Sequence, residues 1–253
     1  MYIKSEIEKN LIDNNIHLEI LEETTSTNDY IKNYANLDNA VVIAKKQTLG
    51  RGRLNRKFYS PENKGVYLSM LVKPRLETTK SVKITTFTAV AVANAIEKVS
   101  GLKTDIKWVN DIFINGKKVC GILAEASQDF KSGYLNYAVI GIGINLYGCD
   151  FPSEISNIAT SIEKESGKKI DANLLVSEII NSLLLIYKDL DSDYLSIYKQ
   201  KCFILNKEIT VDTGKEKFLA KAIDILDNGA LLIEKDGKNF TLDFGDVSIR
   251  FYT

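Results

Sequence analysis

Histidine and cysteine, the side chains that most often bind transition metals, are scarce in this sequence. It has one histidine, His17, and three cysteines, Cys120, Cys149 and Cys202, which form no Cys-x-x-Cys pair. Because a structural zinc site needs four closely spaced ligands of these types, the sequence predicts no zinc centre. His17 stands near the start of a predicted strand, where a structural or exposed role is favoured over catalysis. Free thiols in odd number indicate a reducing, cytoplasmic location.

Long apolar runs and a charge imbalance are also missing. No stretch reaches the roughly 18 apolar residues of a membrane span, and residues 1–10 lack the apolar core of a signal peptide. The 33 Lys and Arg residues are matched by 33 Asp and Glu residues, a balance that argues against a general nucleic-acid binder. We therefore expect a soluble cytoplasmic protein without a membrane or DNA partner.

What is present indicates an α+β protein. With 253 residues, 45% of them apolar, the chain can form one large domain and a small one. Strands are predicted at 17–21, 41–44, 66–72, 104–108 and 137–146, and helices at 4–13, 79–99, 171–190 and 193–202. Gly101 is a natural end for the second helix. The third helix has an apolar stripe expected in the core, made of Leu174, Leu175, Ile179, Leu183 and Ile186.

After the last helix the pattern changes to short strands. Five are predicted, at 207–211, 217–226, 230–235, 239–243 and 247–252, and most are separated by Asp, Asn and Gly residues typical of turns. This spacing predicts a small SH3-like β-barrel. The boundary is placed near Phe203, which divides the chain into a domain at 1–203 and a second at 204–253.

Positive charge is concentrated between residues 39 and 61, which contain no Asp or Glu. The segment carries Lys45, Lys46, Arg51, Arg53, Arg56 and Lys57. Gly50 and Gly52 flank Arg51 and allow close approach of a bound group. Arg51 and Arg53, on either side of Gly52, are suited to grip one anion with their planar guanidinium groups. A solvated basic loop is the alternative; the interleaved glycines favour phosphate or nucleotide binding.

A second informative stretch contains the dipeptide Asn115-Gly116, a strong signal for a two-residue hairpin turn. If this turn sets the register, one face holds Ile112, Ile114 and Val119, and the other holds Asp111, Phe113, Lys118 and Cys120. Asp111 and Lys118 then become diagonal neighbours that can act on one ligand. The alternative is an exposed salt bridge of little energetic weight.

Two further segments allow more than one interpretation. Residues 24–29 are rich in helix-capping side chains, so a plain helix N-cap is one interpretation of Ser26, Thr27 and Asn28. In the strand at 137–146, Gly141 and Gly143 lie on one face, which indicates close approach of a ligand or equally close packing of a helix. Asn145 continues that face.

Five motifs in order carry a resemblance to a known family. They are Ser-Thr-Asn at 26–28, the basic loop at 50–58, Lys-Trp-Val-Asn-Asp at 107–111, Lys-Val-Cys-Gly-Ile-Leu-Ala-Glu at 118–125 and Gly-Ile-Gly-Ile-Asn at 141–145. Together with the C-terminal module, the sequence resembles biotin protein ligases over nearly its whole length. The resemblance implies a mixed sheet backed by helices, like that of class II synthetases and lipoate ligases, followed by an SH3-like domain.

The resemblance also implies a two-step reaction. Biotin's carboxylate attacks the α-phosphate of Mg·ATP, which gives biotinyl-5′-AMP and pyrophosphate. A lysine of the biotin carboxyl carrier protein, or of the carrier domain of a biotin-dependent carboxylase, then attacks this mixed anhydride. Positioning and charge stabilisation are expected to provide the catalysis.

Site residues follow from the matching motifs. Biotin is assigned to Ser26, Thr27, Asn28, Gln47, Arg51, Gly52, Arg53, Lys118 and Gly121, and ATP to Arg53, Arg56, Phe58, Lys107 and Asn145. Catalytic roles are assigned to Lys118, Arg51, Arg53 and Asp111. Lys118 is expected to contact biotin's carboxylate and the oxygen that bridges it to phosphate, and Asp111 is expected to help hold Mg²⁺ or phosphate.

The chain departs from the family pattern at four places. Val109 replaces a proline, Asn55 stands where glycine is common, and Phe58 replaces a tryptophan that lies against adenine. Cys120 stands where a smaller Gly or Ala is usual, which bears on the shape of the biotin pocket.

Other functions remain open at this point. A lipoate or octanoate ligase or transferase shares the fold and a similar lysine, and a biotin-sensing protein would bind without catalysis. Many family members carry an N-terminal winged helix-turn-helix, whereas about twenty residues precede the catalytic motifs here. We therefore expect a ligase without DNA-binding function. Homodimerisation is a further possibility.

Overall fold

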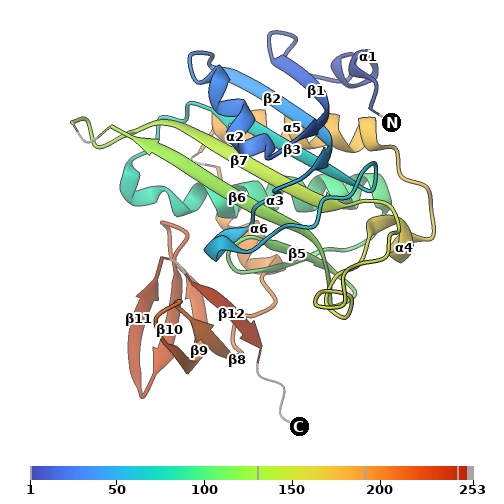
Figure 1. Ribbon diagram of the computed structural model, residues 1–253. Coiled ribbons are helices and arrows are strands. Elements are labelled where there is room, and N and C mark those ends of the chain that lie inside the picture. The colour runs from blue at the N-terminus through green and yellow to red at the C-terminus, as the bar shows by residue number, and fades with distance from the viewer. Residues whose placement is uncertain (1, 130, 191, 244, 250–253) are drawn as a thin grey trace.

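A seven-stranded mixed sheet is the centre of the larger domain in the computed structural model, which describes residues 2–129, 131–190, 192–243 and 245–249 (Figure 1). The strands are β1 (His17–Thr24), β2 (Asn39–Gln47), β3 (Gly65–Val72), β4 (Asp105–Lys107), β5 (Asp111–Ile114), β6 (Lys117–Gln128) and β7 (Leu135–Asn145). Their order is β1-β2-β3-β7-β6-β5-β4, with β1 parallel to β2 and the other pairs antiparallel. The predicted mixed sheet is confirmed.

Two long helices, α3 (Val82–Ser100) and α5 (Ala172–Lys188), cover one face of the sheet (Figure 1). Helix α3 buries most of its alanines and valines, and these small side chains let it lie close to the strands. It ends, as predicted, at Gly101, whose φ of 75° suits glycine. The side chain of Asp171 caps α5 by accepting hydrogen bonds from the amides of Asn173 and Leu174.

Shorter helical elements complete the larger domain. They are α1 (Lys4–Glu8), α2 (Thr27–Tyr30), α4 (Ile162–Ser166), α6 (Tyr194–Lys201), and the 3-10 turns η1 (Ile31–Tyr34), η2 (Arg53–Asn55) and η3 (Thr78–Lys80). α2 lies on the sheet face opposite α3 and α5 (Figure 1). A small apolar cluster that includes Ile31, Val42 and Val139 anchors this region on the sheet.

Two details of the predicted helices are wrong. The N-terminal helix ends at Glu8 rather than at residue 13, because Asn181 of α5 binds the following chain: its Oδ1 accepts from Ile12 N at 2.9 Å and its Nδ2 donates to Asn10 O at 2.8 Å. Leu174 is 39% exposed, whereas the other four residues of its predicted stripe are buried. It lies about 100° around the helix from Leu175, which turns it away from the sheet.

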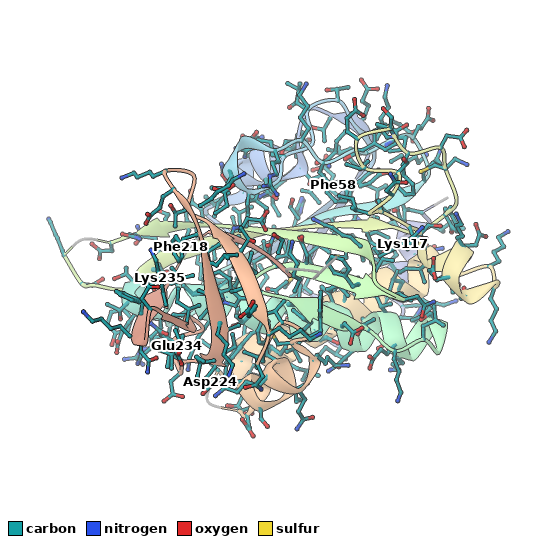
Figure 2. All side chains as sticks on the ribbon, turned by 90° about the horizontal axis from the view of Figure 1, so that it is seen from below. Phe58, Lys117, Phe218, Asp224, Glu234 and Lys235 are labelled. Carbon is teal, nitrogen blue, oxygen red and sulfur yellow. The ribbon has the colours of Figure 1, made fainter. Side chains whose placement is uncertain are left out.

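The C-terminal domain is an antiparallel sheet in the order β11-β10-β9-β8-β12. Its strands are β8 (Glu208–Asp212), β9 (Lys217–Ile225), β10 (Leu231–Lys235), β11 (Lys238–Leu242) and β12 (Asp246–Ile249). The predicted glycine turns have positive φ at Gly214, Gly229 and Gly237. Lys235 lies over the Phe218 ring, 4.1 Å from its centroid (Figure 2). Among the described residues β11 and β12 are edge strands; the predicted end of the last strand, 250–252, lies outside them.

The two sheets are joined by polar contacts as well as by the connection after α6. The Trp108 side chain is buried and its Nε1 donates to Gly229 O at 3.1 Å. Asp246 of β12 pairs with Arg56 at 2.7 Å and with Lys107 at 3.4 Å, both from the larger domain. The proposed boundary between 203 and 204 falls in the connection and stays a prediction. In the part of the chain described, no helix is long and apolar enough to cross a membrane.

The Asp246 contacts predict a pH-dependent contribution to stability. Burial alone would raise the pKa of Asp246, but Lys107 and Arg56 outweigh it and hold that pKa below its ordinary value. The contribution is therefore present above the unfolded-state pKa of about 3.9 and is lost as pH falls through the folded-state pKa. Asp246→Asn should lower the free energy of unfolding at pH 7 by about 1 kcal/mol or less, since Arg56 is largely exposed.

Urea unfolding of both proteins at pH 7, 4 and 3 would measure this difference, which should shrink below pH 4. Glu234→Gln, at an exposed position of the same sheet (Figure 2), is the control and should change little at any pH. A difference between wild type and Asp246→Asn that stays constant down to pH 3 would contradict the assignment.

Candidate active site

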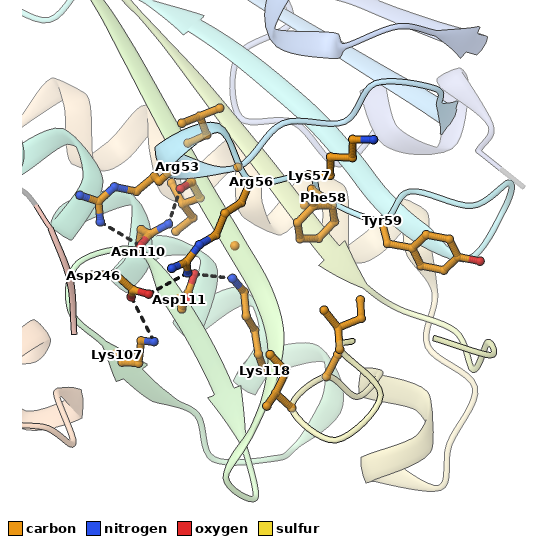
Figure 3. A pocket seen from close by; sticks show the side chains of 18 of the residues that line it. Arg53, Arg56, Lys57, Phe58, Tyr59, Lys107, Asn110, Asp111, Lys118 and Asp246 are labelled. Atoms are coloured by element: carbon orange, nitrogen blue, oxygen red, sulfur yellow. Dashed lines mark hydrogen bonds and ion pairs between the residues drawn. The ribbon is translucent and has the colours of Figure 1, made fainter. Parts of the chain in front are cut away.

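A cavity of about 660 Å³ lies on the sheet face that carries α2 and reaches the C-terminal domain (Figure 3). Every residue that the sequence assigned to a ligand or to catalysis lines it: Ser26, Thr27, Asn28, Gln47, Arg51, Gly52, Arg53, Arg56, Phe58, Lys107, Asp111, Lys118, Gly121 and Asn145. The structure thus brings these residues together. The ligand that each one contacts stays a prediction.

The hairpin of β5 and β6 carries the centre of the cavity. Residues 115–116 form the predicted turn, with φ of 51° and 75°, and Phe113 lies opposite Lys118 as expected. The ammonium of Lys118 lies 2.6 Å from Oδ1 of Asp111, so the predicted neighbours meet (Figure 3). Oδ1 of Asp111 is buried, and beyond this ion pair it has no hydrogen-bond partner among the described residues.

Beyond Phe113 the predicted register is wrong. A β-bulge between Ile112 and Phe113 shifts the pairing by one residue, so that Asp111 lies opposite Gly121 and Ile112 lies opposite Cys120. A bulge adds one unpaired residue to one strand, and here it turns Cys120 into the core, where it is fully buried. Cys120 does not line the cavity, so its departure from the family pattern leaves the cavity wall unchanged.

Gly121 gives Lys118 its path across the sheet. A Cβ atom at residue 121 would lie 3.2 Å from the Lys118 ammonium and 3.5 Å from the Phe58 ring. A larger side chain would therefore displace one of the two. Lys118 is also fixed through its backbone, since its N–H donates to Ile158 O at 2.8 Å and its carbonyl accepts from Thr160 N at 3.0 Å.

One end of the cavity is built from buried hydroxyl and amide groups. Oε1 of Gln47 accepts from the backbone N of Thr27 at 2.9 Å and from its hydroxyl at 3.1 Å, while Nε2 donates to Ser60 Oγ at 3.0 Å. Ser26 occupies the N-cap position of α2 but its side chain makes no cap hydrogen bond. Thr27 lies inside the helix. The plain N-cap interpretation of these side chains is therefore wrong.

Asn28 is held firmly beneath this polar end. Its Nδ2 donates to Glu125 Oε2 at 2.9 Å and to Leu123 O at 3.3 Å, and Ser69 Oγ donates to its Oδ1 at 2.6 Å. Gly141 makes the room: a Cβ there would lie 2.2 Å from Oδ1 of Asn28. Ser69 is not among the predicted site residues, although a serine inside the fully buried strand β3 is a recognisable signal.

The glycine strand β7 also makes room for Phe58. A Cβ on Gly143 would lie 2.5 Å from the Phe58 ring, so the ring lies directly on the strand backbone. Close packing of a helix, one of the two predicted explanations, holds for Gly141, whereas Gly143 is covered by a loop residue; close approach of a ligand stays a prediction. The packing elements are α2, through Asn28, and the basic loop, through Phe58.

The basic loop at 50–58 is closed by its own hydrogen bonds, Phe58 N to Gly50 O at 2.9 Å and Gly52 N to Arg56 O at 2.7 Å. Its positive φ is at Leu54, at 52°. The three arginines of the loop have different partners. Arg51 pairs with Asp29 and Glu125. Arg53 donates to Asn110 Oδ1 at 3.3 Å, and Arg56 pairs with Asp246. Arg51 and Arg53 therefore do not face one shared point here.

The electrostatics of the cavity favour an anion. Its lining includes seven basic side chains, Arg51, Arg53, Arg56, Lys57, Lys107, Lys118 and Lys207, against two acidic ones, Asp111 and Asp246. Burial lowers the pKa of the Arg53 guanidinium, against the raising effect of Asp111, and the group stays charged near neutral pH. Among the described residues, no three His, Cys, Asp or Glu side chains gather to hold a metal ion.

The C-terminal domain and its approach supply lining residues that the sequence analysis did not anticipate: Phe203, Lys207, Gly245, Asp246 and Ser248. Phe203 packs against Phe113 with ring centroids 5.4 Å apart, and Lys207 lies over the Phe203 ring. A loop of the larger domain adds Ile155, Asn157, Ile158 and Ala159. No local pattern marks these positions, because tertiary packing alone brings them to the cavity.

Comparison with known proteins agrees with this architecture. Residues 20–145 match the biotin/lipoate A/B protein ligase family, and residues 204–250 match the biotin protein ligase C-terminal domain. The bifunctional ligase/repressor BirA of Bacillus subtilis is 35% identical over 229 residues, which cover 87% of this chain and 69% of that protein. The biotin–[acetyl-CoA-carboxylase] ligase of Mycobacterium tuberculosis is 26% identical, covering 91% of this chain and 88% of its own length.

A solved structure shares the same fold. The biotin protein ligase from Aquifex aeolicus, in complex with biotin and ATP, superposes with a TM-score of 0.78 at 27% identity, over 92% of this chain and 98% of that one. The chain belongs to the biotin/lipoate A/B protein ligase family and carries the C-terminal domain of biotin protein ligases.

Proposed function

We propose that the protein activates biotin as biotinyl-5′-AMP with ATP and transfers it to a lysine of a biotin carboxyl carrier protein or domain. The observation that carries this proposal is the order in which polar and charged side chains follow one another along one cavity. A buried polar end is followed by the Lys118–Asp111 pair and then by cationic side chains that reach the C-terminal domain. A polar-headed acid and ATP, placed end to end, match that order.

The polar end is where biotin's ureido group binds. Ser26 and Thr27 are each 3% exposed, and Ser60 and Ser69 behind them are also buried. A ligand with hydrogen-bonding atoms in its head can exchange hydrogen bonds with these groups, whereas an aliphatic chain offers them none. This favours biotin over octanoate or lipoate.

Lys118 stands at the reaction centre. When biotin's carboxylate oxygen attacks the α-phosphorus, the P–O bond to pyrophosphate breaks and negative charge spreads over the α-phosphate oxygens. An ammonium fixed near this point stabilises that charge without reorganising. In the second step an uncharged carrier lysine attacks the acyl carbon, its proton is released, and AMP leaves. The same ammonium then stabilises the departing phosphate.

The phosphate end is formed by Arg53, Arg56 and Lys107. Guanidinium groups suit phosphate because their N–H groups point in parallel directions. Phe58 supplies an aromatic surface and Asn145 a hydrogen-bonding amide for the nucleoside. Mg²⁺ travels with ATP, and we assign Asp111 to help hold it, because its Oδ1 is buried and makes no polar contact among the described residues beyond the ion pair with Lys118. Mg²⁺ would neutralise phosphate charge there.

The partner and the setting follow from this activity. The acceptor is a carrier protein or domain of a biotin-dependent carboxylase, and the cytoplasm is the compartment that supplies ATP and reduced thiols together. The proposal includes no DNA partner, because basic and acidic residues are equal in number. Homodimerisation stays open as part of this proposal, and sedimentation of the purified protein with and without biotin would measure it.

The substrate proposal predicts one pattern of pyrophosphate release. Purified protein with Mg·ATP should release pyrophosphate with biotin at least about 10²-fold faster than with lipoate, octanoate or no acid, because a head without hydrogen-bonding atoms gains no hydrogen bonds from the polar end. A carrier domain added to the biotin reaction should become biotinylated. Equal release with lipoate would move the activity to lipoate ligation, and tight biotin binding without release would indicate a sensor.

The role of Lys118 predicts a selective loss of chemistry. Lys118→Ala should slow adenylate formation about 10²-fold or more, the usual cost of removing one charge-stabilising group, while the thermal unfolding temperature changes little. Lys117→Ala is the matched control, since neighbouring strand residues point to opposite faces and Lys117 does not line the cavity. Biotin-dependent ATP–pyrophosphate exchange measures both variants; a wild-type rate in Lys118→Ala would refute the assignment.

A further inference from the structure

The backbone of the basic loop at 50–58 is hydrogen-bonded mainly to itself. Besides the two hydrogen bonds that close it, Arg51 and Lys57 form a β-bridge, so its ends are joined to each other. The loop is fastened to the rest of the molecule chiefly by its side chains. Whatever fixes Arg51 therefore fixes the end of the loop nearest the biotin-binding region.

Two carboxylates hold Arg51. Its Nη2 lies 2.7 Å from Asp29 Oδ1 and 3.1 Å from Glu125 Oε2. Asp29 is on α2 and its side chain is 50% exposed, whereas Glu125 is on β6 and its side chain is 30% exposed. Lys32 lies 3.3 Å from Asp29 and 3.7 Å from Glu125, which adds a second cation to the group.

Glu125 differs from Asp29 in one contact. The same atom that meets Arg51, Oε2, also accepts the hydrogen bond from Asn28 Nδ2 at 2.9 Å. This one oxygen of Glu125 therefore connects Asn28, beneath the polar end of the cavity, with Arg51 of the basic loop. Neither Glu125 nor Asp29 lines the cavity, and neither is assigned to a ligand above.

Asn28 is suited to transmit rather than to bind. Its Nδ2 has two hydrogens, and both are used, by Glu125 and by Leu123 O. Its Oδ1 is occupied by Ser69 and packed against the Gly141 backbone. A ligand seated against Ser26 and Thr27 would restrict Asn28, and through it would restrict Glu125.

We infer that Glu125 is a positioning residue that couples occupancy of the biotin end to the seating of the 50–58 loop, through its shared contact with Asn28 and Arg51. This inference rests on the proposed biotin-binding function. Asp29 has a different role: it strengthens the ion pairing of Arg51, but its side chain makes no hydrogen bond with Asn28, so it does not respond to occupancy of the biotin end.

Hydrogen exchange of peptides that cover 50–58, with and without saturating biotin, tests the coupling. In the wild type and in Asp29→Asn, biotin should slow exchange about threefold or more, as expected for stabilising a partly exposed ion pair. In Glu125→Gln the slowing should fall below about 1.5-fold, because the amide can still accept from Asn28 but has no charge for Arg51. Calorimetry on the same samples shows that biotin is bound.

Glu125→Asp is a second variant that keeps the charge. Its side chain is one methylene shorter and cannot reach Asn28 and Arg51 together, so it should also lose the biotin-linked slowing. Wild-type slowing in both Glu125 variants would overturn the inference, and so would an equal loss in Asp29→Asn, which would make the two carboxylates interchangeable. Absence of biotin binding in the wild-type calorimetry would instead overturn the proposed function, and the inference with it.

Discussion

The concentration of positive charge around one cavity is the constraint on which the rest of this structure depends. The chain is neutral overall, yet seven basic side chains line the cavity with two acidic ones. Without an anion these groups repel one another. Carboxylates from separate elements offset this repulsion. Asp29 and Glu125 pair with Arg51, and Asp111 pairs with Lys118. Asp246 pairs with Arg56 and Lys107. Each pair is partly solvated and contributes little stability by itself, so its main effect is to fix where a cation points.

The second constraint is the space above the sheet backbone, because polar, cationic and aromatic side chains must lie directly on the sheet to surround a ligand. Glycine supplies it at three positions. Gly121 lets Lys118 cross the strand, Gly141 admits Asn28, and Gly143 admits the Phe58 ring. On the opposite face the same strands carry the isoleucines that pack beneath α3 and α5. The alternation of a strand therefore separates a chemical face from a packing face within a few residues.

Local sequence signals predicted the parts that depend on local physics. Asn115-Gly116 has the backbone freedom that a tight hairpin turn needs, and the turn brings the strands that carry Asp111 and Lys118 side by side. The bulge that turned Cys120 inward could not be predicted, since a single extra residue is decided by packing on both faces. Glu125 and Asp246 lay beyond prediction for another reason. Their partners are 97 and 190 residues away in the sequence, and no pattern in a single strand shows which distant side chain it will meet.

The loop shows how these constraints combine. It is held at one end by the pairing of Arg51 with Asp29 and Glu125 and at the other by the pairing of Arg56 with Asp246 of the C-terminal domain, and between these points Arg53 donates to Asn110. A body held at both ends by partly exposed ion pairs is easily displaced, which suits a cover that must admit two substrates and later a carrier lysine. In the proposed binding mode the phosphates of ATP meet Arg56 and Lys107, which both pair with Asp246, so nucleotide binding would exchange an interdomain contact for a ligand contact. The C-terminal domain is thereby part of the active site in electrostatic terms, although the residues assigned to the chemistry all come from the larger domain.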